Sequence, residues 1–315
     1  MKNFTNTDMI EIINTLKEDI KTLKAKETIE FEVLNPDSFS SIYSGTLVTI
    51  DNIQYIYRGY KAWIDLAHSL NAKMLTPILH SKNSVLIRYE LLNSDDSFHK
   101  SIVNKEEKYG EGSIFSHIYK NEEPSFINAY ILALKNVNID KRIRILNLGV
   151  NSGDEFEVIE KISENFNDLE LTGIDYCPSA IKQANEKFQE SQNIKFIQHD
   201  INNLNDLNLG KFDLIISIGT LQSSNLEFNT LLMSIVQNQL KTDGAMILGF
   251  PNCRWVDGEM LYGARVKNYL FSEMGLLYKD VIFSKKYLQQ KKFRVTLTGK
   301  DYIFLTATSI RKSDS

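Results

Sequence analysis

The sequence predicts an α/β protein built on a doubly wound, mostly parallel sheet. Three short apolar runs support this prediction, because each ends in a polar or glycine-rich turn: ILNLGVNSG, LTGIDYCPSAI and NIKFIQHDI. Segments of helical spacing separate these runs, and strands that alternate with helices pair in parallel through right-handed crossovers. The turns then meet at one edge of the sheet, where folds of this class bind nucleoside-type cofactors.

The alternation of strands and helices runs through the second half of the chain. We expect strands at 143–148, 169–174, 194–198, 212–218 and 245–250, and helices at 124–134, 154–165, 178–189, 228–240 and 284–290. Residues 241–244, KTDG, are the expected stop of the fourth helix, with glycine just past its end. Two last strands, 293–298 and 302–308, lie three residues apart and must pair antiparallel. The expected sheet has seven strands, with an antiparallel last strand.

The first hundred residues predict a smaller α+β region. Helical spacing is expected at 9–23 and 60–70, strands at 28–34 and 84–92, and a hairpin whose turn is Asp51-Asn52. The polar segment 93–112 reads as a linker or mobile lid. We therefore expect an accessory domain at 1–110 and a cofactor-binding domain at 111–315. The apolar stripe of the first helix is expected to pack on the body of the protein, with a homodimer as the alternative.

Composition excludes several classes of protein. Of 315 residues, 43% are hydrophobic and 24% charged, as in ordinary globular proteins. No apolar run approaches the length of a membrane span, and the N-terminus lacks the features of a signal peptide, so a cytoplasmic protein is expected. Two cysteines, Cys177 and Cys253, make no disulfide framework, and the cysteines and histidines show no metal-ligand spacing. We expect no metal.

Charge is unevenly distributed. The net charge of −4 argues against a protein that coats nucleic acid, yet residues 253–315 hold twelve Lys and Arg against six Asp and Glu. One interpretation is a solvated basic surface. The other is a basic rim that attracts an anionic substrate.

The turns contain the candidate ligand-binding residues. Gly149 and Gly153 bracket the first turn, where a strand must bend at once into a helix, and Asn151 also tolerates positive φ. Such a turn is often only structural. Asp175 ends the second strand, where a carboxylate can accept both hydroxyls of a ribose. Asp200 ends the third, where it can accept from an exocyclic amine. For both aspartates, a helix cap or turn is the alternative role.

Two cofactors suit these turns: a nicotinamide dinucleotide and S-adenosylmethionine. A dinucleotide site favours the GxGxxG pattern, which is incomplete here. Asp154 and Glu155 also place negative charge at the start of the next helix. That charge repels a pyrophosphate but not a cationic sulfonium with a zwitterionic methionine tail. The antiparallel last strand also favours S-adenosylmethionine.

Residues from about 140 to 308 resemble the class I, Rossmann-like S-adenosylmethionine-dependent methyltransferases. ILNLGVNSG is similar to the first motif of the family, LTGIDYCPSAI to the second and FIQHDI to the third. KFDLIISIGTLQSSN resembles the fourth motif and LKTDGAMILGFPN the fifth. The pattern departs from the family at Asn147, where an acidic residue often contacts the methionine amine, and at Val150 and Asn151.

The resemblance implies a set of cofactor-binding residues. The turn from Asn147 through Gly149 and Asn151 to Gly153 would hold the methionine end. The remaining assignments are Asp175 for the ribose, Asp200 and Ile201 for the adenine, and Ser217 and Gly219 near the sulfonium; Tyr176 is also counted among the cofactor-binding residues.

Candidate acceptor residues follow the fourth and fifth strands. Gln222 can orient an acceptor, and Asn252 and Arg254 lie where acceptors approach in this fold. The insertion that follows carries Tyr262 and Arg265 and is expected to cap the acceptor; a surface helix pair is the alternative. The sequence thus predicts a methyltransferase for a small anionic molecule. The alternatives are an RNA-modifying methyltransferase, which the charge disfavours, and a non-catalytic S-adenosylmethionine-binding module.

Overall fold

The computed structural model of the chain describes residues 1–96, 110–223, 226–263 and 274–311. Its contacts divide the chain into two compact units. Unit 1 comprises residues 1–97 and 255–261, and unit 2 comprises residues 98–254 and 262–315. The separate roles expected for 1–110 and 111–315 stay a prediction.

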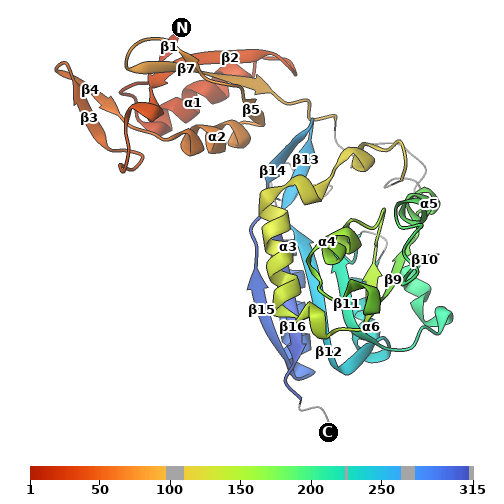
Figure 1. Ribbon diagram of the computed structural model, residues 1–315. Coiled ribbons are helices and arrows are strands. Elements are labelled where there is room, and N and C mark those ends of the chain that lie inside the picture. The colour runs from red at the N-terminus through yellow and green to blue at the C-terminus, as the bar shows by residue number, and fades with distance from the viewer. Residues whose placement is uncertain (97–109, 224–225, 264–273, 312–315) are drawn as a thin grey trace. The chain divides into compact units, whose positions relative to one another are not determined.

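Unit 2 contains, within the described residues, a seven-stranded sheet (Figure 1). The strand order is β10 (Ile194–Gln198), β9 (Glu170–Asp175), β8 (Arg144–Leu148), β11 (Phe212–Ile218), β12 (Leu240–Pro251), β16 (Tyr302–Ser309), β15 (Phe293–Thr298). The first five strands pair in parallel, and β16 pairs antiparallel with both β12 and β15. This confirms the predicted doubly wound sheet and its antiparallel last strand.

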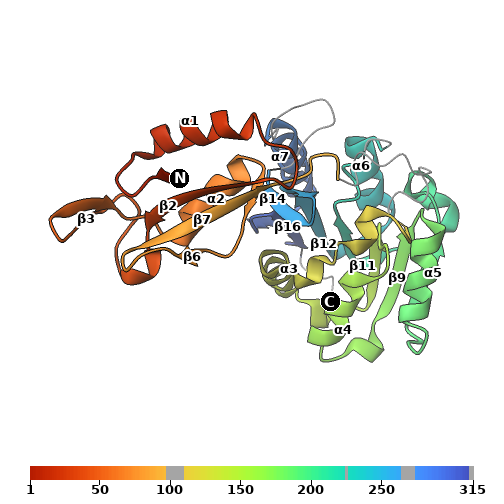
Figure 2. The same ribbon diagram turned by 90° about the horizontal axis from the view of Figure 1, so that it is seen from above.

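Helices cover both faces of this sheet. One face carries α3 (Pro124–Asn136), α4 (Asp154–Ile162) and α5 (Pro178–Lys187), and the other carries α6 (Phe228–Asn238) and α7 (Met274–Gln290), as Figure 2 shows. The central strand β11 reads FDLIISI and is buried at six of its seven positions, because helices lie on both sides of it. Short 3₁₀ turns complete the unit: η2 (Ile114–His117), η3 (Lys120–Glu122), η4 (Ile139–Lys141), η5 (Phe166–Asp168) and η6 (Ile201–Leu207).

The end of α6 and the start of α7 differ from the prediction. α6 ends at Asn238 and β12 already begins at Leu240, so the expected stop at Lys241–Gly244 lies within the strand. Gly244 allows close packing there, since an added Cβ would lie 2.9 Å from both Leu240 Cδ1 and the Lys241 carbonyl oxygen. α7 begins at Met274, ten residues before the predicted start at 284. Leu277 and Val281 extend its buried stripe toward the N-terminus.

Unit 1 is a smaller sheet with two helices on one face. Its strands are ordered β1 (Lys2–Asn3), β2 (Thr28–Leu34), β7 (Ser84–Leu91), β5 (Ala72–Met74), and β6 (Ile78–Leu79) also pairs with β7. Alternate strand residues, Phe31 and Val33 on β2 and Ile87 on β7, are buried in one core with α1 (Met9–Ile20) and α2 (Tyr60–Ser69). A further 3₁₀ turn, η1 (Pro36–Ser38), follows β2.

Two hairpins complete the described chain. β3 (Leu47–Ile50) and β4 (Ile53–Ile56) flank Asp51 and Asn52, whose φ angles of 50° and 64° are those of the predicted tight turn. β13 (Cys253–Val256) and β14 (Glu259–Tyr262) form the second hairpin. Its tip belongs to unit 1, where the Asp257 carboxylate accepts hydrogen bonds from Lys26 Nζ at 2.5 Å and from the Asn93 N–H at 2.8 Å. Val256 and Leu261 pack there against Leu92.

Of the helices within the described ranges, none has the length and apolar character needed to cross a membrane.

Candidate active site

The first turn follows β8, the strand between β9 and β11. Gly149, Asn151 and Gly153 have φ angles of 75°, 45° and 86°, in the left-handed region that the sequence predicts for them. Gly149 also has no room for a side chain, because an added Cβ would lie 2.5 Å from Thr220 Cγ2. The turn is therefore closely packed against Thr220, and only glycine fits at position 149.

Asp175 ends β9 and closes this turn. One carboxylate oxygen accepts the Asn151 N–H at 2.9 Å, and the other accepts the Cys177 N–H at 2.9 Å. Burial raises the pKa of Asp175, and the backbone hydrogen bonds from Cys177 and Asn151 offset part of that rise. The Tyr176 N–H is a third backbone donor to this carboxylate, which leaves acceptor capacity for one further hydrogen bond from a ligand hydroxyl. Tyr176, the next residue, is 48% exposed.

Asp200 and Ile201 follow β10. Asp200 is the N-cap of η6 and accepts the Asn202 N–H at 2.9 Å, so the capping role expected as the alternative is present. Ile201 is buried in the apolar core of unit 2.

Ser217 and Gly219 end β11. Ser217 is buried and its hydroxyl donates to the Leu148 carbonyl at 3.3 Å, which ties the ends of β11 and β8 together. Gly219 has a φ of 74° and its N–H donates to the Gly249 carbonyl at 2.9 Å. The predicted cofactor residues therefore lie at the carboxyl ends of β8, β9, β10 and β11, which are neighbours in the sheet.

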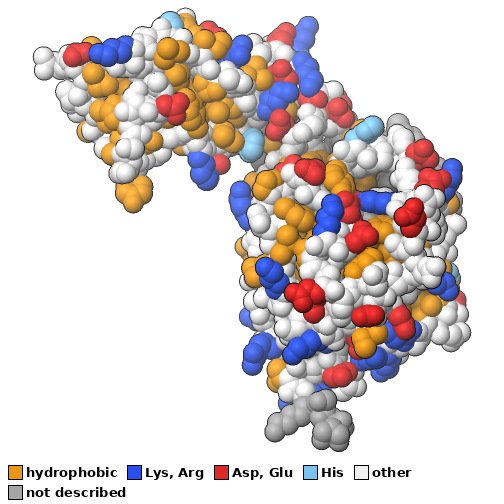
Figure 3. Space-filling view, in the orientation of Figure 1, with side chains coloured by type: hydrophobic (Ala, Val, Ile, Leu, Met, Phe, Trp, Pro, Cys, Tyr) orange, Lys and Arg blue, Asp and Glu red, His pale blue; other side chains and the backbone are white. Residues whose placement is uncertain are grey.

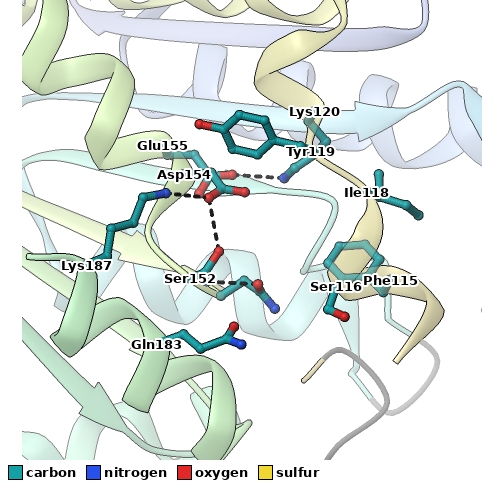
Figure 4. A pocket seen from close by; sticks show the side chains of 11 residues that line it. Phe115, Ser116, Ile118, Tyr119, Lys120, Ser152, Asp154, Glu155, Gln183 and Lys187 are labelled. Carbon is teal, nitrogen blue, oxygen red and sulfur yellow. Dashed lines mark hydrogen bonds and ion pairs between the residues drawn. The ribbon is translucent and has the colours of Figure 1, made fainter. Parts of the chain in front are cut away.

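A cavity of about 200 Å³ adjoins the first turn (Figure 4). Its walls come from the turn, from the start of α4, from α5 and from the segment around η2 and η3; they are Phe115, Ser116, Ile118, Tyr119, Lys120, Asn151, Ser152, Asp154, Glu155, Gln183 and Lys187. Acidic and basic side chains gather on the face of unit 2 that carries α4 (Figure 3). The cavity is therefore polar and has charges of both signs.

Two ion-pair groups form this polar wall. In the first, Lys187 Nζ lies 3.0 Å from Asp154 and 2.8 Å from Glu157, and Glu157 also accepts the Tyr119 hydroxyl. In the second, Lys120 Nζ donates to Glu155 at 3.1 Å. Burial alone would lower the pKa of Lys120, but the charges of Glu155 and Asp154, the neighbouring Tyr302 and the hydrogen bond to Glu155 together outweigh burial and raise that pKa. Lys120 therefore stays charged.

Asn147 connects the second group to the end of β8. It is 1% exposed, and its side-chain N–H donates to Glu155 at 3.2 Å. Its Oδ1 is buried and accepts no hydrogen bond from the described residues. Buried acceptors are nearly always paired, so this atom is suited to a donor on a ligand. Sequence reasoning predicted Asn147 but assigned no contact to Glu155 and did not identify Lys120, which lies far away in the chain.

The predicted acceptor residues have mixed surroundings. Gln222 Oε1 is buried and unpaired within the described residues. Asn252 is 3% exposed and donates to the Lys300 carbonyl at 3.0 Å, so it fastens the turn between β15 and β16. Arg254 donates to the carbonyls of Tyr262 and Gly263 at 2.8 and 3.1 Å. Arg265 lies outside the described residues.

No group of three or more His, Cys, Asp or Glu that could hold a metal occurs within the ranges that the structure describes.

Comparison with known proteins decides the class of this site. A family model described as "Methyltransferase domain" matches residues 139–295, which include β8 to β12 and the turns described above. The chain carries a methyltransferase domain over residues 139–295. S-adenosylmethionine is the methyl donor of this superfamily. The unpaired Asn147 Oδ1 at the end of β8 fits the ammonium of its methionine tail, so the residues present suit this cofactor.

Solved structures of methyltransferases resemble the chain at low identity. The N-methyltransferase NodS from Bradyrhizobium japonicum, in complex with S-adenosyl-L-homocysteine, is 13% identical and covers 68% of this chain and 97% of its own, with a TM-score of 0.45. Magnesium protoporphyrin IX methyltransferase from Synechocystis is 17% identical, covering 57% of this chain and 76% of its own, with a TM-score of 0.38. Aeropyrum pernix fibrillarin is 14% identical, with coverages of 57% and 76% and a TM-score of 0.39. No curated protein matches this methyltransferase.

Proposed function

We propose that this methyltransferase transfers the methyl group of S-adenosylmethionine to a small anionic acceptor. The observation that carries the cofactor half of the proposal is the hydrogen bond from the Asn151 N–H to Asp175, which brings the predicted methionine-binding turn and the predicted ribose-binding carboxylate together. The acceptor half is supported by Arg254, a cation that two backbone carbonyls hold just beyond β12.

The cofactor residues are assigned along the carboxyl edge of the sheet. Asn147, Gly149, Asn151 and Gly153 hold the methionine end. Further along this edge are Asp175 and Tyr176 for the ribose, Asp200 and Ile201 for the adenine, and Ser217 and Gly219 beside the sulfur. Three backbone N–H groups hold the Asp175 carboxylate in place and leave it acceptor capacity for a ribose hydroxyl, which supports its assignment.

When bound, the cofactor supplies an electrophilic methyl group on a sulfonium. Transfer of that group is an in-line displacement, so much of the rate enhancement comes from holding the acceptor in line with it. We assign this orienting role to Gln222, whose unpaired Oε1 can accept from an N–H or O–H of the acceptor. Arg254 attracts an anionic group, and Asn252, Tyr262 and Arg265 complete the proposed acceptor side.

The RNA alternative is disfavoured by the position of a basic pocket. Among the residues lining this second cavity, of about 190 Å³, are Lys211, Lys241, Lys291 and Arg311. They lie next to the starts of β11, β12 and β15 and the end of the antiparallel β16. This is the amino edge of the sheet, opposite the turns that we assign to the cofactor. An RNA held there would have to reach around the domain to place a base at the methyl group.

A labelling experiment tests the proposal. The protein is incubated with S-[methyl-¹⁴C]adenosylmethionine and an extract divided into tRNA, protein and small-molecule fractions, with Asp175→Ala as the control. We expect label in the small-molecule fraction, retained on an anion exchanger and absent with the control. Label that is released by ribonuclease would contradict the proposed acceptor. RNA binding that weakens steeply between 50 and 200 mM salt would contradict it as well, because counterion release gives that dependence.

A further inference from the structure

Lys120 and Glu155 form a buried ion pair in the wall of the cavity. The Lys120 side chain is 12% exposed and that of Glu155 is 4% exposed, and their charged atoms lie 3.1 Å apart. Lys120 comes from η3 and Glu155 from the first turn of α4, so the pair joins two separate segments. Figure 4 shows both side chains beside the cavity, with the dashed contact between them.

A buried ion pair of this kind needs an explanation beyond packing. Removing two charges from water costs free energy that their attraction often fails to recover. The position of Glu155 in the first turn of α4 offsets part of this cost for the carboxylate. For Lys120, the nearby charge of Asp154 and the Phe126 ring, whose centroid lies 5.4 Å from Nζ, offset part of the cost, but among the described residues only Glu155 lies within ion-pair distance of Nζ.

The neighbours of the pair are arranged for a ligand with charges of both signs. Asn147 donates to the free side of Glu155, while its own Oδ1 points to no donor of the described residues. An acceptor oxygen, a carboxylate and an ammonium therefore lie within one connected group beside the first turn. That set is complementary to an α-amino acid group, which presents an ammonium and a carboxylate on one carbon.

We propose that the Lys120–Glu155 pair recognises both charged groups of the methionine tail: Glu155 and Asn147 Oδ1 accept from the α-ammonium, and Lys120 donates to the α-carboxylate. The inference rests on the proposed function, because it presumes that this edge of the sheet binds S-adenosylmethionine. It also explains how the domain tolerates an amide at position 147: the negative charge comes from Glu155 instead.

Three ligands distinguish the contributions of the two charged groups of the methionine tail to the affinity. S-adenosylhomocysteine carries both groups, its decarboxylated analogue 5′-(3-aminopropylthio)adenosine keeps only the amine, and 5′-methylthioadenosine has neither. We expect calorimetry on the unmodified protein to show affinity falling about tenfold to a hundredfold at each step, as charge-assisted hydrogen bonds are lost. Equal affinity for all three would overturn the proposal.

Two variants then assign each group to its residue. Lys120→Met is expected to lower the affinity for S-adenosylhomocysteine at least tenfold and to leave the affinity for the decarboxylated analogue unchanged. Glu155→Gln is expected to lower the affinity for both of those ligands. Neither variant should affect 5′-methylthioadenosine, which therefore reports whether the adenosine site is intact. Lys187→Met is the matched control, because Lys187 also forms ion pairs in this wall but is not assigned to the tail.

The outcomes distinguish the two proposals. If the unmodified protein binds none of the three ligands, the proposed function fails. If it binds them but Lys120→Met lowers affinity for all three alike, the pair is structural and the present inference is wrong. Should a variant fail to fold, Lys120→Arg and Glu155→Asp keep the charges. Equal affinity for the three ligands in the unmodified protein would still overturn the inference.

Discussion

The carboxylate of Asp175 holds the backbone of Asn151 by a hydrogen bond of 2.9 Å. One side chain at the end of β9 thereby fixes the turn after β8, and its second oxygen fixes Cys177 at the start of α5. We propose that the same carboxylate binds the ribose, so structural and binding roles meet in one residue.

We expect Asp175→Ala to lower the affinity for S-adenosylhomocysteine at least tenfold and to destabilise the protein. The stability loss should be about 1–3 kcal/mol, because three backbone N–H groups lose their acceptor. Calorimetry and urea unfolding measure the two effects. Asp175→Asn keeps one carbonyl acceptor and should lose less stability. Unchanged affinity in Asp175→Ala would show that the ribose does not bind here.

Gly149→Ala should be among the most damaging small substitutions in unit 2. The added methyl group would combine a φ of 75° with a clash against Thr220. We expect the free energy of unfolding to fall by about 2–4 kcal/mol. Gly112→Ala is a matched control, because Gly112 has a φ of 76° but no atom within 4 Å of the added Cβ. That control should lose about 1 kcal/mol. Equal losses in the two variants, measured by urea unfolding, would rule out the close packing of Thr220.

Glu157 should make stability depend on acid pH. Burial alone would raise its pKa, but hydrogen bonds from Lys161, Lys187 and Tyr119 outweigh burial and lower that pKa to about 2. Because the folded-state pKa lies below the unfolded value, the stabilisation is present above about pH 4.5 and is lost as the pH falls toward 2. The free energies of unfolding of the unmodified protein and of Glu157→Gln should differ by about 1–2 kcal/mol at pH 7 and converge near pH 2. A difference that stays constant with pH would contradict this.

Neither cysteine should react in the native state. Cys177 and Cys253 are 2% and 6% exposed, and burial raises the pKa of Cys253 to about 12, with Asp301 adding to the rise. The reactive thiolate is therefore scarce at pH 8. We expect Ellman's reagent to modify neither thiol before urea is added and both afterwards. Rapid modification of Cys253 in the native protein would mean that the end of β12 opens.

The sheet was predictable because each of its strands is an apolar run with a distinct turn after it. β10 and β11 begin and end where expected, and Asp51 and Asn52 form the expected turn. The short strands β1, β5 and β6 were not predicted, since two or three residues have no measurable periodicity. The start of β12 was missed because KTDG resembles a helix stop, although tertiary pairing extends the strand through it.

The site was predictable only where a motif marks it. Asn147, Asp175 and Ser217 lie at the carboxyl ends of strands and were found from that position. The burial of Glu155 was not apparent, because an acid near a helix start is normally exposed. Lys120 had no signal, since its partner lies 35 positions away. The predicted lid at 93–112 falls largely, and the predicted acceptor cap partly, outside the described residues.

The tip of the β13–β14 hairpin has a practical consequence for anyone dissecting this protein. A fragment that stops near residue 97 would lack Val256 and Leu261, and Leu92 would face water; the fragment would also lose the aspartate that anchors Lys26. Expression of residues 1–97 by simple truncation should therefore yield a frayed product. A graft that carries the seven residues 255–261 on a short linker would restore the missing piece.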